Sequence, residues 1–214
     1  MNHSPMVMVA LGLEDTVASL VAAIDRALAD SARPLIIGID GPDCAGKTTM
    51  SRLLLQQFMA RSRTLLIHAD DYLHAQGHRE RRGEFSVEAF LFDYFDQDAL
   101  LRGALEVMSD IGIGTGIKPD ILMVEGMFLF RPPLNAHFTF RIRMEIAEDV
   151  VLERAMKRDV GVIGDETWVR EHYIRQCIPA QRFYRTAADP AAQADILIDV
   201  HQDGCFRIRG PSIA

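Results

Sequence analysis

The sequence predicts a three-layer α/β fold, in which helices cover both faces of a mainly parallel sheet. Short apolar, β-branched runs alternate with amphipathic helical segments along the chain, the pattern of successive βα units. The chain has 214 residues, without an internal repeat or low-complexity linker, and predicts a single domain over 1–214. Hydrophobic residues make up 49% and charged residues 25%, ordinary values for a globular protein that exclude bulk disorder.

The first half of the chain predicts two strands set between helices. After a lead-in over 1–12, apolar residues at spacings of three and four predict an N-terminal helix over 13–31. LIIGID at 35–40 is typical of a buried parallel strand. A glycine-bounded loop and a helix over about 47–60 follow. TLLIHA at 64–69 predicts a second strand, then an irregular polar segment to 85 and helix over 86–108, interrupted around 93–96.

The second half predicts three buried strands and an edge strand. GIGTG at 112–116 predicts a turn, and the third strand covers 121–124 and ends in Glu125-Gly126. A fourth strand is expected over 138–146, followed by helices over 148–158 and 166–187 with a glycine-containing break at 159–165 between them. The fifth strand covers 195–200, and 205–209 predicts a last edge strand.

The strongest motif is GPDCAGKT at 41–48, which fits the phosphate-loop pattern G-x-x-x-x-G-K-[ST] between a predicted strand and a predicted helix. The loop's backbone N–H groups and the helix N-terminus form a cradle for phosphate. We expect Lys47 to reach the β- and γ-phosphates and Thr48 to bind Mg²⁺. Cys44 is either a reactive thiol near a helix N-terminus or a small filler. The expected nucleotide-binding residues here are Gly41, Asp43, Cys44, Ala45, Gly46, Lys47, Thr48 and Thr49.

Carboxylates follow two of the predicted strands. In open α/β sheets ligands bind at the carboxyl ends of the strands, and phosphoryl transfer to an alcohol uses a carboxylate that orients and deprotonates the hydroxyl. Asp70, the first polar residue after the second strand, is the candidate base. Glu125 ends the third strand and is the candidate metal ligand together with Thr48. The alternatives are a turn cap for Asp70 and Asp71, and a surface acid for Glu125.

Two groups of arginines are candidates for anion binding. Arg154 and Arg158 are four residues apart, hence on one helical face, and glycines follow them. They predict a lid over about 154–166 that delivers positive charge to the phosphates, unless they form a solvated basic face. The second group lies in the polar segment and consists of Arg79, Arg81 and Arg82. These residues either bind an acidic or phosphorylated acceptor or are solvated charges of a loop.

Four elements in order resemble the uridine kinase and phosphoribulokinase group of P-loop kinases, which includes bacterial pantothenate kinases and sugar-kinase-like relatives. These elements are the phosphate loop, Asp70-Asp71-Tyr72, Val124-Glu125-Gly126 and RAMKRD at 154–159. The resemblance covers about 34–200 and implies a P-loop NTPase fold with sheet order 2-3-1-4-5. It also implies that Asp70 is the base toward the acceptor, that Glu125 lies near metal and acceptor, and that Arg154 and Arg158 belong to a lid. The chain departs from the group at Leu73 and Ala155, where a second aromatic residue and a second arginine are usual.

These observations predict an ATP-dependent kinase for an alcohol of a small metabolite, with ATP and Mg²⁺ as cofactors. The expected catalytic residues are Lys47, Asp70, Glu125 and Arg158. A GTPase switch is disfavoured because IKPD at 117–120 is the nearest string to a guanine-reading motif and lies before the third strand. An ATP-hydrolysing regulator or transport-associated protein is the remaining alternative. The acceptor stays open among nucleosides, sugars, sugar phosphates and pantothenate-like alcohols.

Charge and cysteine content predict the surroundings of the chain. Lys and Arg number 23 against 30 Asp and Glu, a net charge of −7, so we expect no nucleic-acid partner. No apolar run approaches the roughly 20 residues of a membrane span, and the first residues lack the basic region of a signal peptide. Three cysteines without a pairing motif favour the cytoplasm. A homodimer stays open.

Overall fold

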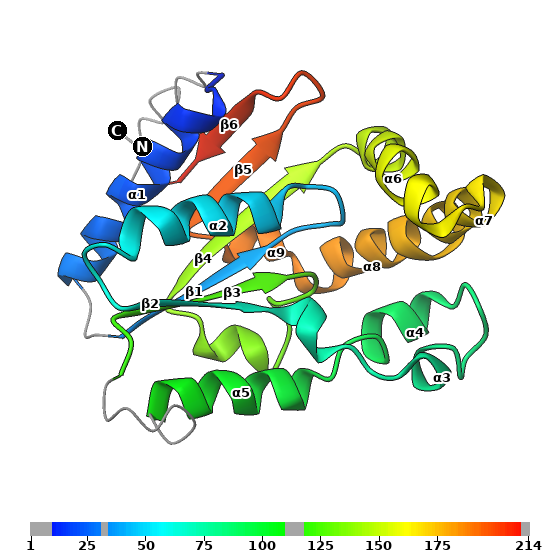
Figure 1. The fold of residues 1–214 in the computed structure, drawn as a ribbon, viewed down its shortest axis with the longest axis horizontal. Coiled ribbons are helices and arrows are strands. Elements are labelled where there is room, and N and C mark those ends of the chain that lie inside the picture. The colour runs from blue at the N-terminus through cyan, green and yellow to red at the C-terminus, as the bar shows by residue number, and fades with distance from the viewer. Residues whose placement is uncertain (1–9, 31–33, 110–117, 211–214) are drawn as a thin grey trace, which may run out of the picture.

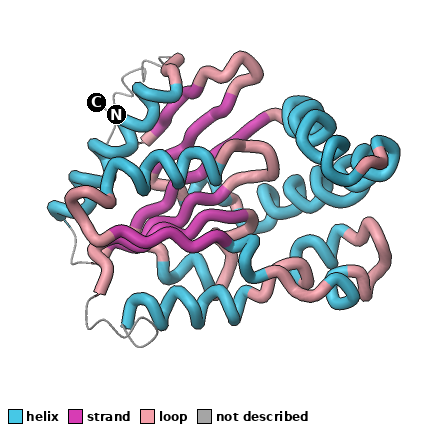
Figure 2. The backbone as a smooth tube through the Cα atoms, in the orientation of Figure 1, coloured by secondary structure: helices cyan, strands magenta, loops and turns pink. Residues whose placement is uncertain are grey.

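The computed structural model describes residues 10–30, 34–109 and 118–210, and these form the three layers expected from the sequence. Figures 1 and 2 show the sheet in the middle, with helices on both of its faces. The expected turn at 112–116 and most of the lead-in over 1–12 lie outside the described residues. No helix among the described residues is long and apolar enough to cross a membrane. The three cysteines are unpaired.

Five parallel strands and one antiparallel strand make up the described sheet, in the order β2-β3-β1-β4-β5-β6. The resemblance implied five strands in the order 2-3-1-4-5, so the observed order differs by the added edge strand. That strand, β6, pairs antiparallel with β5, at the place where 205–209 predicted an edge. The strands are β1 (Leu35–Asp40), β2 (Thr64–His68), β3 (Ile121–Gly126), β4 (Phe140–Ile146), β5 (Ile196–Val200) and β6 (Phe206–Arg209).

Strand order decides which face each helix covers. The chain moves outward from β1 to β2 and back inward from β2 to β3, and right-handed crossovers therefore place the two connecting helices on opposite faces. These helices are α2 (Lys47–Phe58) and α5 (Gln97–Ser109). The N-terminal helix α1 (Leu13–Asp30) packs on α2, as Figure 1 shows. The core lies between the sheet and both layers, with Leu54 and Phe58 on one side and Phe128 and Phe130 on the other.

The helices after β4 differ from the sequence prediction. The first, α6 (Glu148–Ile163), runs past the break expected from 159. It ends only at Gly164, whose φ of 80° requires glycine. The segment expected as one helix over 166–187 is instead divided into three elements. These are α7 (Glu166–His172), a π-helical turn η3 (Tyr173–Cys177) and α8 (Ile178–Ala188). Pro179 accounts for the interruption, because proline in a helix removes one N–H and clashes with the carbonyl four residues earlier.

The remaining short elements lie at the carboxyl ends of the strands and on the face of the sheet opposite α2. A 3-10 turn, η1 (Ala69–Tyr72), follows β2 directly. The helix expected over 86–108 is divided into α4 (Val87–Phe92) and α5, as the polar residues around 93–96 indicated. The remaining short elements are α3 (Gln76–Arg79), η2 (Leu134–His137) and α9 (Pro190–Gln193).

Candidate active site

The phosphate loop joins β1 to α2 and turns through left-handed backbone conformations. Cys44 has φ 59° and Gly46 has φ 90°; these conformations favour glycine at the second position. At the start of the loop, a Cβ on Gly41 would lie 2.9 Å from the carbonyl oxygen of Met144 on β4. A side chain there would push the loop away from the sheet, so glycine keeps the loop seated on the strand ends.

Two residues at the beginning of α2 face inward from the loop. Lys47 is buried, and its Nζ donates to the carbonyl oxygen of Pro42 at 2.8 Å. The Thr48 hydroxyl donates to Glu125 Oε1 at 3.0 Å. Both side chains therefore lie where the motif predicts a phosphate-binding ammonium and a metal-binding hydroxyl.

Glu125 is buried at the end of β3 and joins the loop to β2. Its Oε1 accepts from Thr48 and lies 2.6 Å from Nδ1 of His68, so the surface-acid alternative is wrong. His68 was missed from the sequence. The signal was its position as the last residue of β2, which pairs in register with Glu125. The two hard oxygens of Thr48 and Glu125 suit Mg²⁺, which binds few protein ligands beside water and phosphate. The described residues hold no group of three or more His, Cys, Asp and Glu suited to a metal.

Asp70 lies in η1, exposed at the mouth of the same region. Partial desolvation raises the pKa of its carboxyl above the ordinary aspartate value of 3.8; Asp43 and Glu125 add to this rise, and Lys47 opposes it. A raised pKa makes the carboxylate a better proton acceptor near neutral pH. The neighbouring Asp71 is also exposed and does not line the cavity described next.

A cavity of about 310 Å³ brings the predicted residues together. Gly41 and Ala45 are the two predicted residues that do not line it: Gly41 packs against β4, and Ala45 is in the core. Figure 1 shows α6 and α7 on one side of these strand ends, with α3 and α4 on the other. The lining residues are Asp43, Cys44, Gly46, Lys47, Thr48, Thr49, Asp70, Glu125, Met127, Arg154 and Arg158.

The two arginines of α6 contact the loop and its surroundings, so they are not simply a solvated face. Arg154 donates to the carbonyl oxygens of Cys44 at 3.1 Å and His201 at 3.2 Å. Arg158 donates to the adjacent Asp159 at 2.6 Å and to the Tyr173 hydroxyl at 3.0 Å. Its side chain is 54% exposed, which leaves it free to meet a ligand in the cavity.

Cys44 behaves as a small filler in the structure. Burial raises the pKa of its thiol to about 11, although Arg158 and Lys47 act in the opposite direction. The thiol is therefore protonated at pH 7, and the helix N-terminus does not make it a nucleophile.

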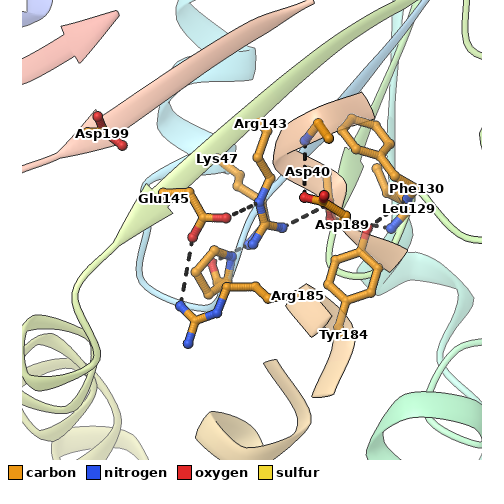
Figure 3. A network of polar contacts seen from close by, with 12 residues as sticks. Asp40, Lys47, Leu129, Phe130, Arg143, Glu145, Tyr184, Arg185, Asp189 and Asp199 are labelled. Carbon is orange, nitrogen blue, oxygen red and sulfur yellow. Dashed lines mark hydrogen bonds and ion pairs between the residues drawn. The ribbon is translucent and has the colours of Figure 1, made fainter. Parts of the chain in front are cut away.

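A buried ion pair beneath the loop was also missed. Asp40, the last residue of β1, accepts from Arg143 on β4 at 2.7 Å and from the Tyr184 hydroxyl at 2.8 Å. Both charged side chains have no exposed surface, and Arg143 also binds Glu145 at 2.8 Å, as Figure 3 shows. Losing one partner would leave a buried unpaired charge. The network therefore fixes the residue that directly precedes Gly41.

The chain is similar to small-molecule kinases, although no protein-family model matches it. It is 33% identical over 121 residues to a pantothenate kinase of Clavibacter sepedonicus, covering 46% of this chain and 37% of that kinase. It is 27% identical over 148 residues to a uridine kinase of Latilactobacillus sakei, covering 61% and 69% of the two chains. The chain thus spans little more than a third of the length of the pantothenate kinases it matches. These relatives confirm the resemblance drawn from the sequence.

A solved structure confirms the fold. A possible uridine kinase from Bacillus stearothermophilus superposes with a TM-score of 0.64 at 21% identity, over 86% of this chain and 98% of the other. At this identity the likeness concerns the fold, which is that of P-loop kinases.

Proposed function

We propose that the protein is an ATP-dependent phosphotransferase that moves the γ-phosphoryl group of ATP to an alcohol of a small metabolite. One observation carries the proposal: the loop residues Lys47 and Thr48, the strand-end acids Asp70 and Glu125, and Arg158 line a single cavity. A nucleotide-binding loop alone supports hydrolysis equally well. A carboxylate with a raised pKa in the same cavity adds what transfer to an alcohol requires.

The loop and α6 hold the phosphates of ATP in this proposal. Backbone N–H groups of 41–48 cradle the anion, and the Lys47 ammonium leaves Pro42 to bind the β- and γ-phosphates. Arg158, and Arg154 beside it, bring positive charge from α6 to the transferring group. The segment over about 154–166 then acts as a lid, which excludes water when it closes.

The acceptor hydroxyl is oriented by Asp70. Its carboxylate accepts the hydroxyl proton as the oxygen attacks the γ-phosphorus and the bond to the β-bridging oxygen breaks. Thr48 and Glu125 would hold Mg²⁺, which neutralises charge on the phosphates when bound. His68 contacts the Glu125 oxygen and keeps that carboxylate oriented.

The test separates chemistry from nucleotide binding. Asp70→Asn is expected to lower kcat about 10²- to 10⁴-fold, the usual range for general-base assistance, while the Kd of a fluorescent ATP analogue changes little. The matched control is Asp71→Asn, an adjacent exposed acid that does not line the cavity, and it is expected to keep full activity. Both variants are assayed by ATP consumption over a panel of alcohols.

Two results would contradict the proposal. Near-normal kcat in Asp70→Asn on the true acceptor would leave Asp70 as a turn cap, which Asn serves equally well. ATP consumption that no alcohol stimulates, and no phosphorylated alcohol among the products, would favour the regulatory ATP-hydrolysing alternative.

A further inference from the structure

A second cavity, of about 320 Å³, lies between the 76–85 segment and the helices α7 and η3. Aromatic rings line both sides of this cavity. Among the described residues, Arg79 is the single lysine or arginine that lines it. The lining residues used below are Gln76, Arg79, Phe85, Tyr94, Trp168 and His172. Figure 1 shows α3 and α7, which border this cavity, at the same carboxyl ends of the strands as the loop between β1 and α2.

Both walls of this cavity extend to the reaction site. On one side, the turn that carries Asp70 ends at Tyr72, whose carbonyl oxygen accepts from Asp96 at 2.8 Å, and His74 N–H donates to the Tyr94 carbonyl at 3.0 Å. On the other side, His172 directly precedes Tyr173, whose hydroxyl lies 3.5 Å from Asp43 in the nucleotide cavity. One wall of the second cavity thus belongs to the segment that follows the turn of Asp70, and the other is joined through Tyr173 to the nucleotide cavity.

The three clustered arginines have different environments. Arg81 and Arg82 both bind the carboxylate of Asp93, whose side chain is only 3% exposed. These two guanidinium groups balance a buried charge. They are therefore committed to holding the segment in place.

Arg79 differs from both neighbours. Its guanidinium lies over the ring of Tyr94, 4.8 Å from the centroid, and its Nε is buried without a hydrogen-bond partner. No ion pair joins it to a carboxylate of the described residues. A buried donor without a partner is costly, and a guanidinium is shaped to bind a carboxylate through two parallel hydrogen bonds.

The two acids near Arg79 are bound elsewhere. Glu80 accepts from Gln76 at 2.8 Å, and Glu84 accepts from the Trp168 indole at 2.7 Å. Their negative charges nevertheless lie at the same cavity. Two glutamates beside a single arginine repel a doubly charged phosphate ester more strongly than a singly charged carboxylate.

We propose that the acceptor alcohol carries a carboxylate, which Arg79 binds in the second cavity while the hydroxyl lies at Asp70. This inference rests on the proposed kinase function and names the substrate class. Phe85, Tyr94 and Trp168 cover the apolar body of the molecule. This class disfavours sugar phosphates, which the sequence left open, as acceptors.

Trp168 provides a binding readout that needs no catalysis. It is the single tryptophan of the chain, it lines the cavity, and it is stacked on His172 at 4.9 Å. Fluorescence titrations would compare glycerate with glycerol and glycerol 3-phosphate, and pantothenate with its alcohol, pantothenol. The expected result is that, for at least one molecular body, the carboxylate binds at least tenfold more tightly than its neutral or phosphorylated counterpart. No carboxylate preference in either set overturns the inference.

Variants identify the residue responsible. Arg79→Met is expected to lose at least tenfold in carboxylate affinity, with neutral ligands unaffected, and Arg79→Lys to keep part of the preference. The control is Arg175→Met, whose guanidinium lies over Phe85 at 5.0 Å but pairs with Glu171 at 3.3 Å. It should retain the preference. Equal losses in Arg79→Met and Arg175→Met would overturn the assignment.

The two proposals fail in different ways. Carboxylate binding that depends on Arg79, without any phosphoryl transfer, would refute the kinase function and retain the site. Phosphoryl transfer to neutral or phosphorylated alcohols that is unchanged in Arg79→Met would refute the carboxylate class and retain the kinase.

Discussion

Gly126→Ala is expected to damage catalysis through one contact with the turn that carries Asp70. A Cβ at Gly126, the last residue of β3, would lie 2.5 Å from the Cβ of Ala69. Two carbons pack at about 3.5–4.0 Å, so the turn must move by roughly 1 Å. Ala69 directly precedes Asp70 and is buried, so the displacement is transmitted to the base.

The magnitude follows from that displacement. Overpacking of this kind costs about 1–3 kcal/mol, which corresponds to a Tm drop of roughly 2–12 °C in a chain of this size. A misplacement of about 1 Å at a reacting group costs up to about 10²-fold in rate. The loop itself is not displaced, so the Kd for ATP should stay within about threefold of wild type.

The assay is kcat on the best acceptor of the alcohol panel, together with thermal unfolding. The matched control is Gly38→Ala in β1, where a new Cβ would meet Phe130 and Phe138 at 2.9 Å, in the core and away from Asp70. It should lower Tm and keep kcat. Adding Ala69→Gly to Gly126→Ala removes the opposing Cβ and should restore both kcat and Tm. A kcat within twofold of wild type in Gly126→Ala, or no rescue by Ala69→Gly, would refute this reasoning.

Four further predictions concern the nucleotide site and the paired charges. Lys47→Ala should abolish nucleotide turnover with Tm near wild type, because alanine suits the first turn of α2; activity within tenfold of wild type would contradict the loop assignment. Turnover should require Mg²⁺ and favour ATP over GTP, which a comparison of kcat/KM with either nucleotide checks. The raised pKa of Asp70 moves the acid limb of the kcat profile to higher pH than an ordinary aspartate would give, since the base works ionised and the rate falls as pH falls through its pKa; this limb should disappear in Asp70→Asn. Hydrogen bonds from Arg81 and Arg82 lower the pKa of Asp93, so its stabilising effect is present above about pH 4 and is lost as pH falls toward the folded pKa. Asp93→Asn should lower Tm by several degrees at pH 7 and weaken the acid dependence of Tm.

The sequence was most informative where chemistry depends on local spacing. The loop at 41–48 and the acids after β2 and β3 occupy fixed offsets from strand ends, so periodicity and one motif sufficed to place Lys47, Thr48, Asp70 and Glu125 in one cavity. Parallel strands carry this information because their carboxyl ends meet at one edge.

Contacts between distant segments had no such local signal. Arg143 stands in a buried strand, where a charged residue is unusual, and its partner Asp40 lies 103 residues away. Likewise, the pairing of Arg81 and Arg82 with Asp93 depends on how the 76–85 segment folds over α4. The end of α6 was placed too early because Gly161 is tolerated within the helix and only Gly164 adopts the left-handed conformation.

The distribution of charge within the site explains how an acidic chain can bind a polyphosphate. The net charge is −7, yet the cavity collects Lys47, Arg154 and Arg158 from the loop and α6. Asp70 and Glu125 come from the other side, at the ends of β2 and β3, where the proposed mechanism places the proton transfer and the metal ion, and Asp43 adds a third acid from the loop. The two arginines of α6 and the two strand-end acids thus arise from different elements, so a motion of α6 would change the distance between them without disturbing the strands. Beneath the loop, the ion pair of Asp40 and Arg143 is fully buried. Tyr184 donates a hydrogen bond to Asp40, and Arg143 donates one to Glu145. Such a base would keep the loop in position during the lid motion proposed above.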